Sequence, residues 1–107
     1  MARTRNRQDQ SAVAVTASMP APLICLGYQQ LTSLTSANAL TAPEGASYAQ
    51  MLAEGAALRW RDDGGTPTAS VGMPLSVGGE LRYDGDLAAF RVIQQGTGGI
   101  LNVSYYG

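Results

Sequence analysis

Short segments of alternating apolar and polar residues, separated by glycine-rich turns, run from residue 46 to the C-terminus. In the segment 58–61, an extended backbone places Leu58 and Trp60 on one side and the two arginines on the other. Asp62-Asp63-Gly64-Gly65 follows, and these residue types tolerate the positive φ of a tight reversal. The pattern therefore predicts a strand that ends in a hairpin turn directly after Trp60, the only tryptophan.

The same period of two predicts strands over 47–53, 80–83, 87–94 and 100–106. A helix competes over 47–53, but Gly45 and Gly55 bracket too few residues for one, so we predict a strand. Asp84-Gly85 predicts a further hairpin, and Pro67 makes 68–72 a short or edge strand. The residues expected to share a strand face are Ala49, Met51 and Ala53; Leu81 and Tyr83; Phe90 and Val92; and Leu101, Val103 and Tyr105.

The N-terminal half is less regular. Residues 1–22 are polar at first and end in Pro20 and Pro22, which predicts an extended or disordered arm. Residues 23–34 form the first strand region, with a bulge at Gly27, although a helical turn also fits its spacing. Residues 33–45 have the composition of a loop. Cys25, inside the apolar run, is interpreted as a thiol packed in the core.

Strands at this spacing, with glycine-rich turns, are typical of antiparallel sandwiches and barrels. We therefore predict an all-β chain: a small antiparallel β-sandwich, jelly-roll-like, over 23–107, preceded by the extended N-terminal arm over 1–22. A domain of 107 residues buries a modest core. We expect it to gain stability by association, either as a homo-oligomer or on a larger partner.

The residues that most enzymes need are scarce. The chain has no histidine, which removes the commonest general base and metal ligand, and one cysteine, which excludes an internal disulfide. The four acids at the 62–63 and 84–86 turns allow a calcium site, but aspartate before glycine is also what tight turns require: Asp62, Asp63, Asp84 and Asp86. We predict no catalytic residue, no cofactor, no metal and no small-molecule substrate.

Charge also fails to indicate a polyanionic partner, since the net charge is −1. Arg59, Arg61, Arg82 and Arg91 allow a basic stripe, but the acidic turns beside them favour ion pairs on the sheet surface. No apolar run approaches the length that spans a bilayer, and the run near residue 12 is too short for a secretory signal. We expect a protein made in a reducing cytoplasm that binds neither nucleic acid nor membrane.

The C-terminal Tyr105-Tyr106-Gly107 is the clearest indication of a protein interface. Neighbouring strand residues point in opposite directions, so one tyrosine can pack inward while the other faces a partner. The arginines of the arm and the lone tryptophan complete the predicted interface: Arg3, Arg5, Arg7, Trp60, Tyr105 and Tyr106.

Several strings over residues 45–107 resemble small virion proteins of tailed bacteriophages: Ala57-Leu58-Arg59-Trp60-Arg61-Asp62-Asp63-Gly64, Pro67-Thr68-Ala69, Val71-Gly72-Met73, Tyr83-Asp84-Gly85-Asp86-Leu87 and Leu101-Asn102-Val103-Ser104-Tyr105-Tyr106. The resemblance implies a capsid-associated β-sandwich that decorates or cements the phage head and binds the major capsid protein or other virion subunits. It brings no catalytic residues with it. Two alternatives stay open: a tail, tail-tip or fibre component, and a cupin-like barrel with Trp60 and tyrosines lining a ligand pocket.

Overall fold

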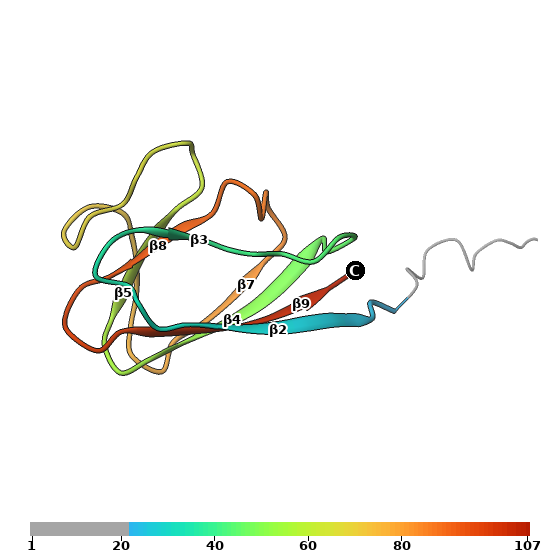
Figure 1. Cartoon of the computed structure of the whole chain (residues 1–107), viewed down its shortest axis with the longest axis horizontal. Helices are drawn as coiled ribbons and strands as arrows, with labels where there is room; N and C mark the ends of the chain where they lie inside the picture. The colour runs from blue at the N-terminus through green and yellow to red at the C-terminus, as the bar shows by residue number, and fades with distance from the viewer. Residues whose placement is uncertain (1–21) are drawn as a thin grey trace, which may run out of the picture.

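The computed structural model describes residues 22–107, and these form strands joined by turns and loops without a helix (Figure 1). The strands follow the chain at short intervals, as the turn spacing predicted. Their bounds are β2 (Cys25–Leu31), β3 (Asn38–Ala39), β4 (Tyr48–Glu54), β5 (Leu58–Arg61), β6 (Met73–Leu75), β7 (Glu80–Tyr83), β8 (Arg91–Gln94) and β9 (Ile100–Tyr106).

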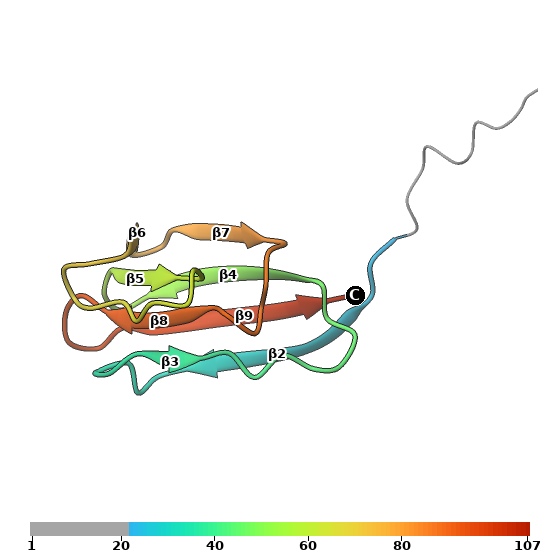
Figure 2. The ribbon, with the colours of Figure 1, turned by 90° about the horizontal axis from the view of Figure 1, so that it is seen from above.

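The strands form two four-stranded antiparallel sheets, which face each other as a sandwich (Figure 2). The first sheet has the order β2-β9-β4-β7 and the second the order β3-β8-β5-β6. Each strand of the first half of the described chain pairs with its mirror partner in the second half: β2 with β9, β3 with β8, β4 with β7 and β5 with β6. The chain is thus one long hairpin rolled onto itself, the topology of a jelly roll.

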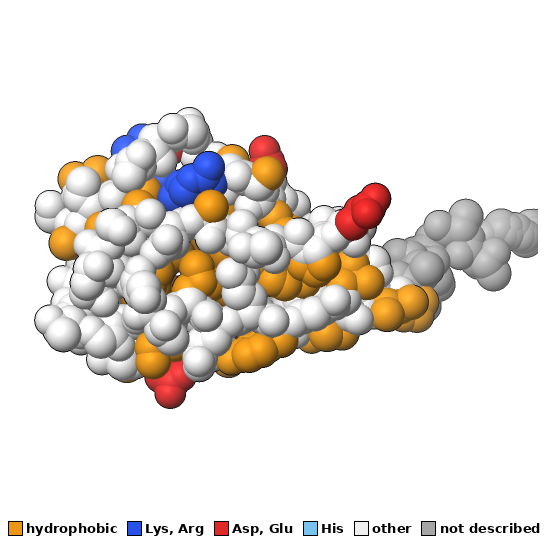
Figure 3. All heavy atoms as spheres, in the orientation of Figure 1, with side chains coloured by type: hydrophobic (Ala, Val, Ile, Leu, Met, Phe, Trp, Pro, Cys, Tyr) orange, Lys and Arg blue, Asp and Glu red, His pale blue; other side chains and the backbone are white. Residues whose placement is uncertain are grey.

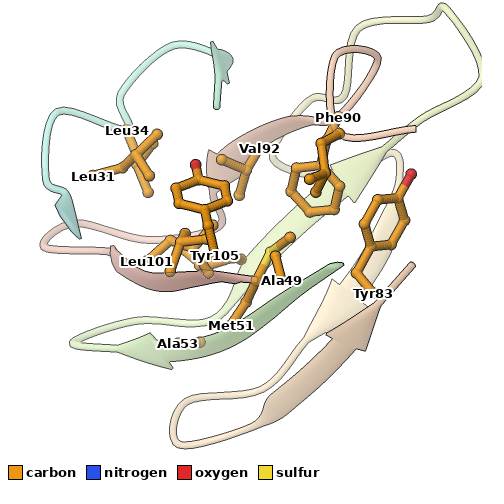
Figure 4. Packing of buried hydrophobic residues seen from close by; sticks show 13 residues of the cluster. Leu31, Leu34, Ala49, Met51, Ala53, Tyr83, Phe90, Val92, Leu101 and Tyr105 are labelled. Atoms are coloured by element: carbon orange, nitrogen blue, oxygen red, sulfur yellow. The ribbon is translucent and has the colours of Figure 1, made fainter. Parts of the chain in front are cut away.

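The core lies between the sheets and is filled by the inward side chains of both (Figure 4). Leu101, Val103 and Tyr105 of β9 are each at most 1% exposed. Leu101 and Tyr105 point toward Val92 of β8 and toward Phe90, which directly precedes β8 (Figure 4). The strand predicted over 100–106 is confirmed, whereas the one predicted over 87–94 begins only at Arg91, after a turn at 87–89. The predicted alternation is confirmed also for β4, where Ala49, Met51 and Ala53 are buried.

Two predicted hairpins are wrong in detail. In a jelly roll most connections cross between the sheets, so strands that follow each other in sequence are not hydrogen-bonded neighbours. Asp84-Gly85 connects β7 and β8, which belong to different sheets, and forms no hairpin. β5 does pair with β6, but the reversal occupies residues 62–72 rather than a tight turn at Asp62–Gly65.

Two local predictions also need correction. Residues 68–72 hold only an isolated bridge between Thr68 and Val71, and the edge strand comes later, at β6. Cys25 is exposed rather than buried, because it starts an edge strand at the end of the sandwich. The predicted bulge is confirmed, since the β2·β9 register shifts between Cys25 and Gly27.

Candidate interaction face

The outer side of the first sheet carries three of the chain's five tyrosines. Strand alternation sends the core residues of these four strands inward and leaves the intervening residues on the opposite side. We call this outer side the tyrosine face: Cys25, Tyr28, Gln30, Tyr48, Gln50, Leu52, Glu54, Glu80, Arg82, Asn102, Ser104 and Tyr106. Only three of these side chains are charged, so most of the face is aromatic, aliphatic or amide.

The register of the sheet arranges the face in rows that cross the strands. One row runs through Tyr28, Ser104, Gln50 and Arg82, in that order. Tyr28 is 64% exposed, and its hydroxyl donates a hydrogen bond of 2.6 Å to Oδ1 of Asn102 in the next row. The rows are therefore tied together by side-chain hydrogen bonds as well as by the backbone ladder.

Asn102 is the centre of that network. Its Oδ1 also accepts from Nε2 of Gln30 at 3.0 Å, and its Nδ2 donates to Oε1 of Glu54 at 3.0 Å. A shallow hollow of about 150 Å³ lies beside it, bordered in part by Tyr28 and Leu52. Each of these amide side chains already forms hydrogen bonds within the sheet, so the network holds them in fixed positions.

The charged corner of the face is neutralised locally. Nε of Arg82 lies 3.2 Å from Oε2 of Glu80, and Nε2 of Gln50 donates to the same carboxylate oxygen. The Gln50 hydrogen bond and then the Arg82 guanidinium lower the pKa of Glu80. The carboxylate is therefore held in its ionised, paired form.

The structure places the predicted interface residues in different environments. Tyr106 lies on the tyrosine face, with its ring centroid 6.0 Å from that of Tyr48. Tyr105 is buried and donates a hydrogen bond of 2.6 Å to Oε1 of Gln29, so its assignment to an interface is wrong. Trp60 is half-buried and stacks on Phe90 with centroids 5.1 Å apart, which makes it mainly a packing residue. Arg3, Arg5 and Arg7 lie outside the described residues.

Sequence reasoning assigned only Tyr106 of this face to an interface and missed the other members, among them Tyr28, Tyr48 and Leu52. The alternation pattern could have indicated them, because Tyr48 and Leu52 alternate along β4 with the buried residues Ala49, Met51 and Ala53. What the sequence lacks is the strand order, which brings β2, β9 and β4 side by side and so collects the tyrosines on one surface.

The acidic turns meet only in part. The Tyr83 hydroxyl donates to Oδ2 of Asp62 at 2.6 Å and lies 3.2 Å from the Asp86 carbonyl oxygen. Burial and then Asp62 raise the pKa of Tyr83. Asp63 instead pairs with Arg61 at 2.7 Å, which lowers the pKa of Asp63 to about 2. Across residues 22–107 there is no group of three or more acids or cysteines placed to hold a metal ion.

The arginines do not form a basic stripe. The predicted pairing with the acidic turns is confirmed only for Arg61, which pairs with Asp63, whereas Arg82 pairs with Glu80 of its own strand. Arg59 donates from Nη1 to the Gly72 carbonyl at 2.8 Å. Arg91 donates to the carbonyls of Ala88 and Phe90 at 2.9 and 3.0 Å. These four guanidinium groups thus bind carboxylate or carbonyl oxygens of their own chain, and these contacts stabilise the fold.

Comparison of the chain with protein-family models, with curated proteins and with solved structures finds no match. In the described part of the chain, no helix has the length and hydropathy needed to cross a membrane.

Proposed function

We propose that this protein is a non-enzymatic structural component of a tailed-phage virion, a decoration protein that stabilises the head by binding the major capsid protein. The observation that carries the proposal is the tyrosine face. Protein interfaces are enriched in tyrosine and depleted of charge at their centre, and this face has both properties. The sequence resemblance to phage virion proteins supplies the identity of the partner.

The chemistry of the described residues supports a binding role rather than turnover. The shifted pKa values belong to ion pairs and buried phenols: that of Asp63 is lowered to about 2, and burial raises that of Tyr105 to about 12. Neither group exchanges protons near neutral pH. Amides that already hydrogen-bond each other give a preorganised surface, which reduces the entropy lost on docking.

The ligand-barrel alternative receives less support. A cupin-like site needs space between the sheets, with Trp60 and tyrosines around it. Here Trp60 stacks on Phe90, and Tyr83 packs edge-on against Phe90 with centroids 5.1 Å apart. These aromatic rings fill the place that such a ligand would occupy.

The experiment is a binding assay with heads that lack the protein. Wild-type protein should cosediment with heads and raise their melting temperature, because many weak contacts repeated over a shell act together. Leu52→Lys, which places a charge at the middle of the tyrosine face, should abolish both effects. Val77→Lys is the matched control, since Val77 is also exposed but lies in the β6–β7 turn.

Retention of the protein on purified tails, with no binding to heads, would instead favour the tail component. Equal binding by wild type and Leu52→Lys would show that the tyrosine face does not meet the capsid.

A further inference from the structure

The sandwich has four edge strands, and three of them carry features that prevent pairing with another chain. An edge strand exposes unpaired N–H and C=O groups, so natural proteins shorten it, charge it or place proline in it. β3 has two residues, β6 has three and includes Pro74, and β7 carries Glu80 and Arg82.

β2 is different from the other three. It has seven residues, CLGYQQL, with neither a charge nor a proline. Its bulge is confined to the start of the strand, between Cys25 and Gly27, so the part from Gly27 to Leu31 pairs with β9 in regular register. This edge is therefore long and regular enough to accept another strand.

Exposed apolar side chains gather at the same edge. Of the eight large hydrophobic residues that are exposed in the described chain, four fall within residues 23–28: Leu23, Ile24, Leu26 and Tyr28. In Figure 3 hydrophobic side chains line the lower margin, where β2 runs, up to the point at which the described chain begins. Such a cluster on an open edge is typical of an interaction site.

We propose that β2 is a self-association edge, which pairs antiparallel with β2 of a second copy around a two-fold axis. In this arrangement the free N–H and C=O groups of each edge can pair with those of the other, and the two-fold axis repeats every contact. Since β2 carries no charge, the pairing brings no like charges together. The two first sheets then join into one continuous sheet, and the two tyrosine faces become one larger surface.

With the two-fold axis at Gln29, the middle of the regular part of the strand, Gly27 of each copy lies opposite Leu31 of the other. Leu23, Ile24 and Leu26 then extend beyond the end of the partner's β2 and flank the seam at both ends. The proposal stands without the proposed function, because it concerns the free protein in solution.

The test uses the full chain, free of capsids, in analytical ultracentrifugation. Wild type is expected to sediment as a dimer of the 11.1 kDa chain. Tyr28→Lys and Gln30→Lys place like charges across the seam and should each weaken dimerisation by at least about tenfold. Val77→Lys adds the same charge at a similarly exposed apolar position away from β2 and should remain dimeric. Circular dichroism of each variant checks that the fold is kept.

Cys25, the only cysteine, provides a native site for a spin label that reports the geometry. With the two-fold axis at Gln29, eight residue steps separate the two Cys25 positions, about 27 Å along the strands. A distance near this value supports antiparallel β2 pairing. A monomer at every concentration, a dimer that survives both lysine substitutions, or a spin-label distance unlike that of antiparallel strands would overturn the proposal.

Discussion

Tyr48 of β4 and Tyr106 of β9 lie opposite each other in the register of the first sheet, and their rings are tilted by 53°. Each ring limits the movement of the other, so little side-chain entropy remains to be lost when a partner covers them. Rigid aromatic residues of this kind are the usual energetic centres of protein interfaces.

The pair can be tested by removing one ring. Tyr106→Ala should weaken binding to phage heads by about tenfold or more, the effect expected for an interface hot spot. Met73→Ala is the control, because Met73 is 56% exposed but lies on β6 of the other sheet. Titration of labelled protein against heads measures both. Equal losses in the two variants would contradict a role specific to the tyrosine face.

Trp60 should affect stability instead of binding. Its indole stacks on Phe90 and meets the ring of Tyr83 at 5.9 Å, so truncation removes contacts from both neighbours. Trp60→Ala is expected to lower the free energy of unfolding by about 3 kcal/mol, as measured by urea denaturation. The folded fraction should still bind heads with wild-type affinity. A loss of affinity without a loss of stability would instead indicate that Trp60 contacts the capsid.

Gly55 is predicted to be the glycine least tolerant of a side chain. Its φ is +82°, and an added Cβ would collide with the backbone carbonyl oxygen of Gly98. Gly64 has nearly the same φ, +88°, but open space around it. Both alanine variants pay the cost of positive φ, about 1 kcal/mol. Gly55→Ala should therefore be clearly less stable than Gly64→Ala in thermal unfolding, and equal stability would contradict the observed contact.

Alkaline pH should destabilise the fold through its buried phenols. Burial raises the pKa of Tyr105 from 10.0 to about 12, so the folded state holds its proton more tightly than the unfolded chain does. The stabilisation is complete below pH 10 and is lost as the pH rises toward 12. Urea midpoints should fall across this range for wild type and fall less for Tyr105→Phe. An identical decline in both proteins would assign the effect to other groups.

Much of the fold followed from local patterns in the sequence. The alternation in β4, β8 and β9 identified their buried residues, because one face of each strand must be apolar wherever two sheets pack. Turn residues located most of the boundaries between strands. These are properties of single segments and need no knowledge of their neighbours.

The failures share one physical cause, which is that pairing is not local. Asp84-Gly85 has the composition of a hairpin, but the sandwich uses it to cross between sheets. Cys25 lies in an apolar run, and only its position at the start of an edge strand explains its exposure. Tyr28, Tyr48 and Tyr106 are far apart in sequence, and the order β2-β9-β4 brings them onto one face.

Cryo-electron microscopy of the purified virion tests the central claim most directly. The account predicts density for the jelly roll on the surface of the head, with the outer side of the β2-β9-β4-β7 sheet against the major capsid protein. Density confined to the tail, or a virion that lacks this protein, would contradict it.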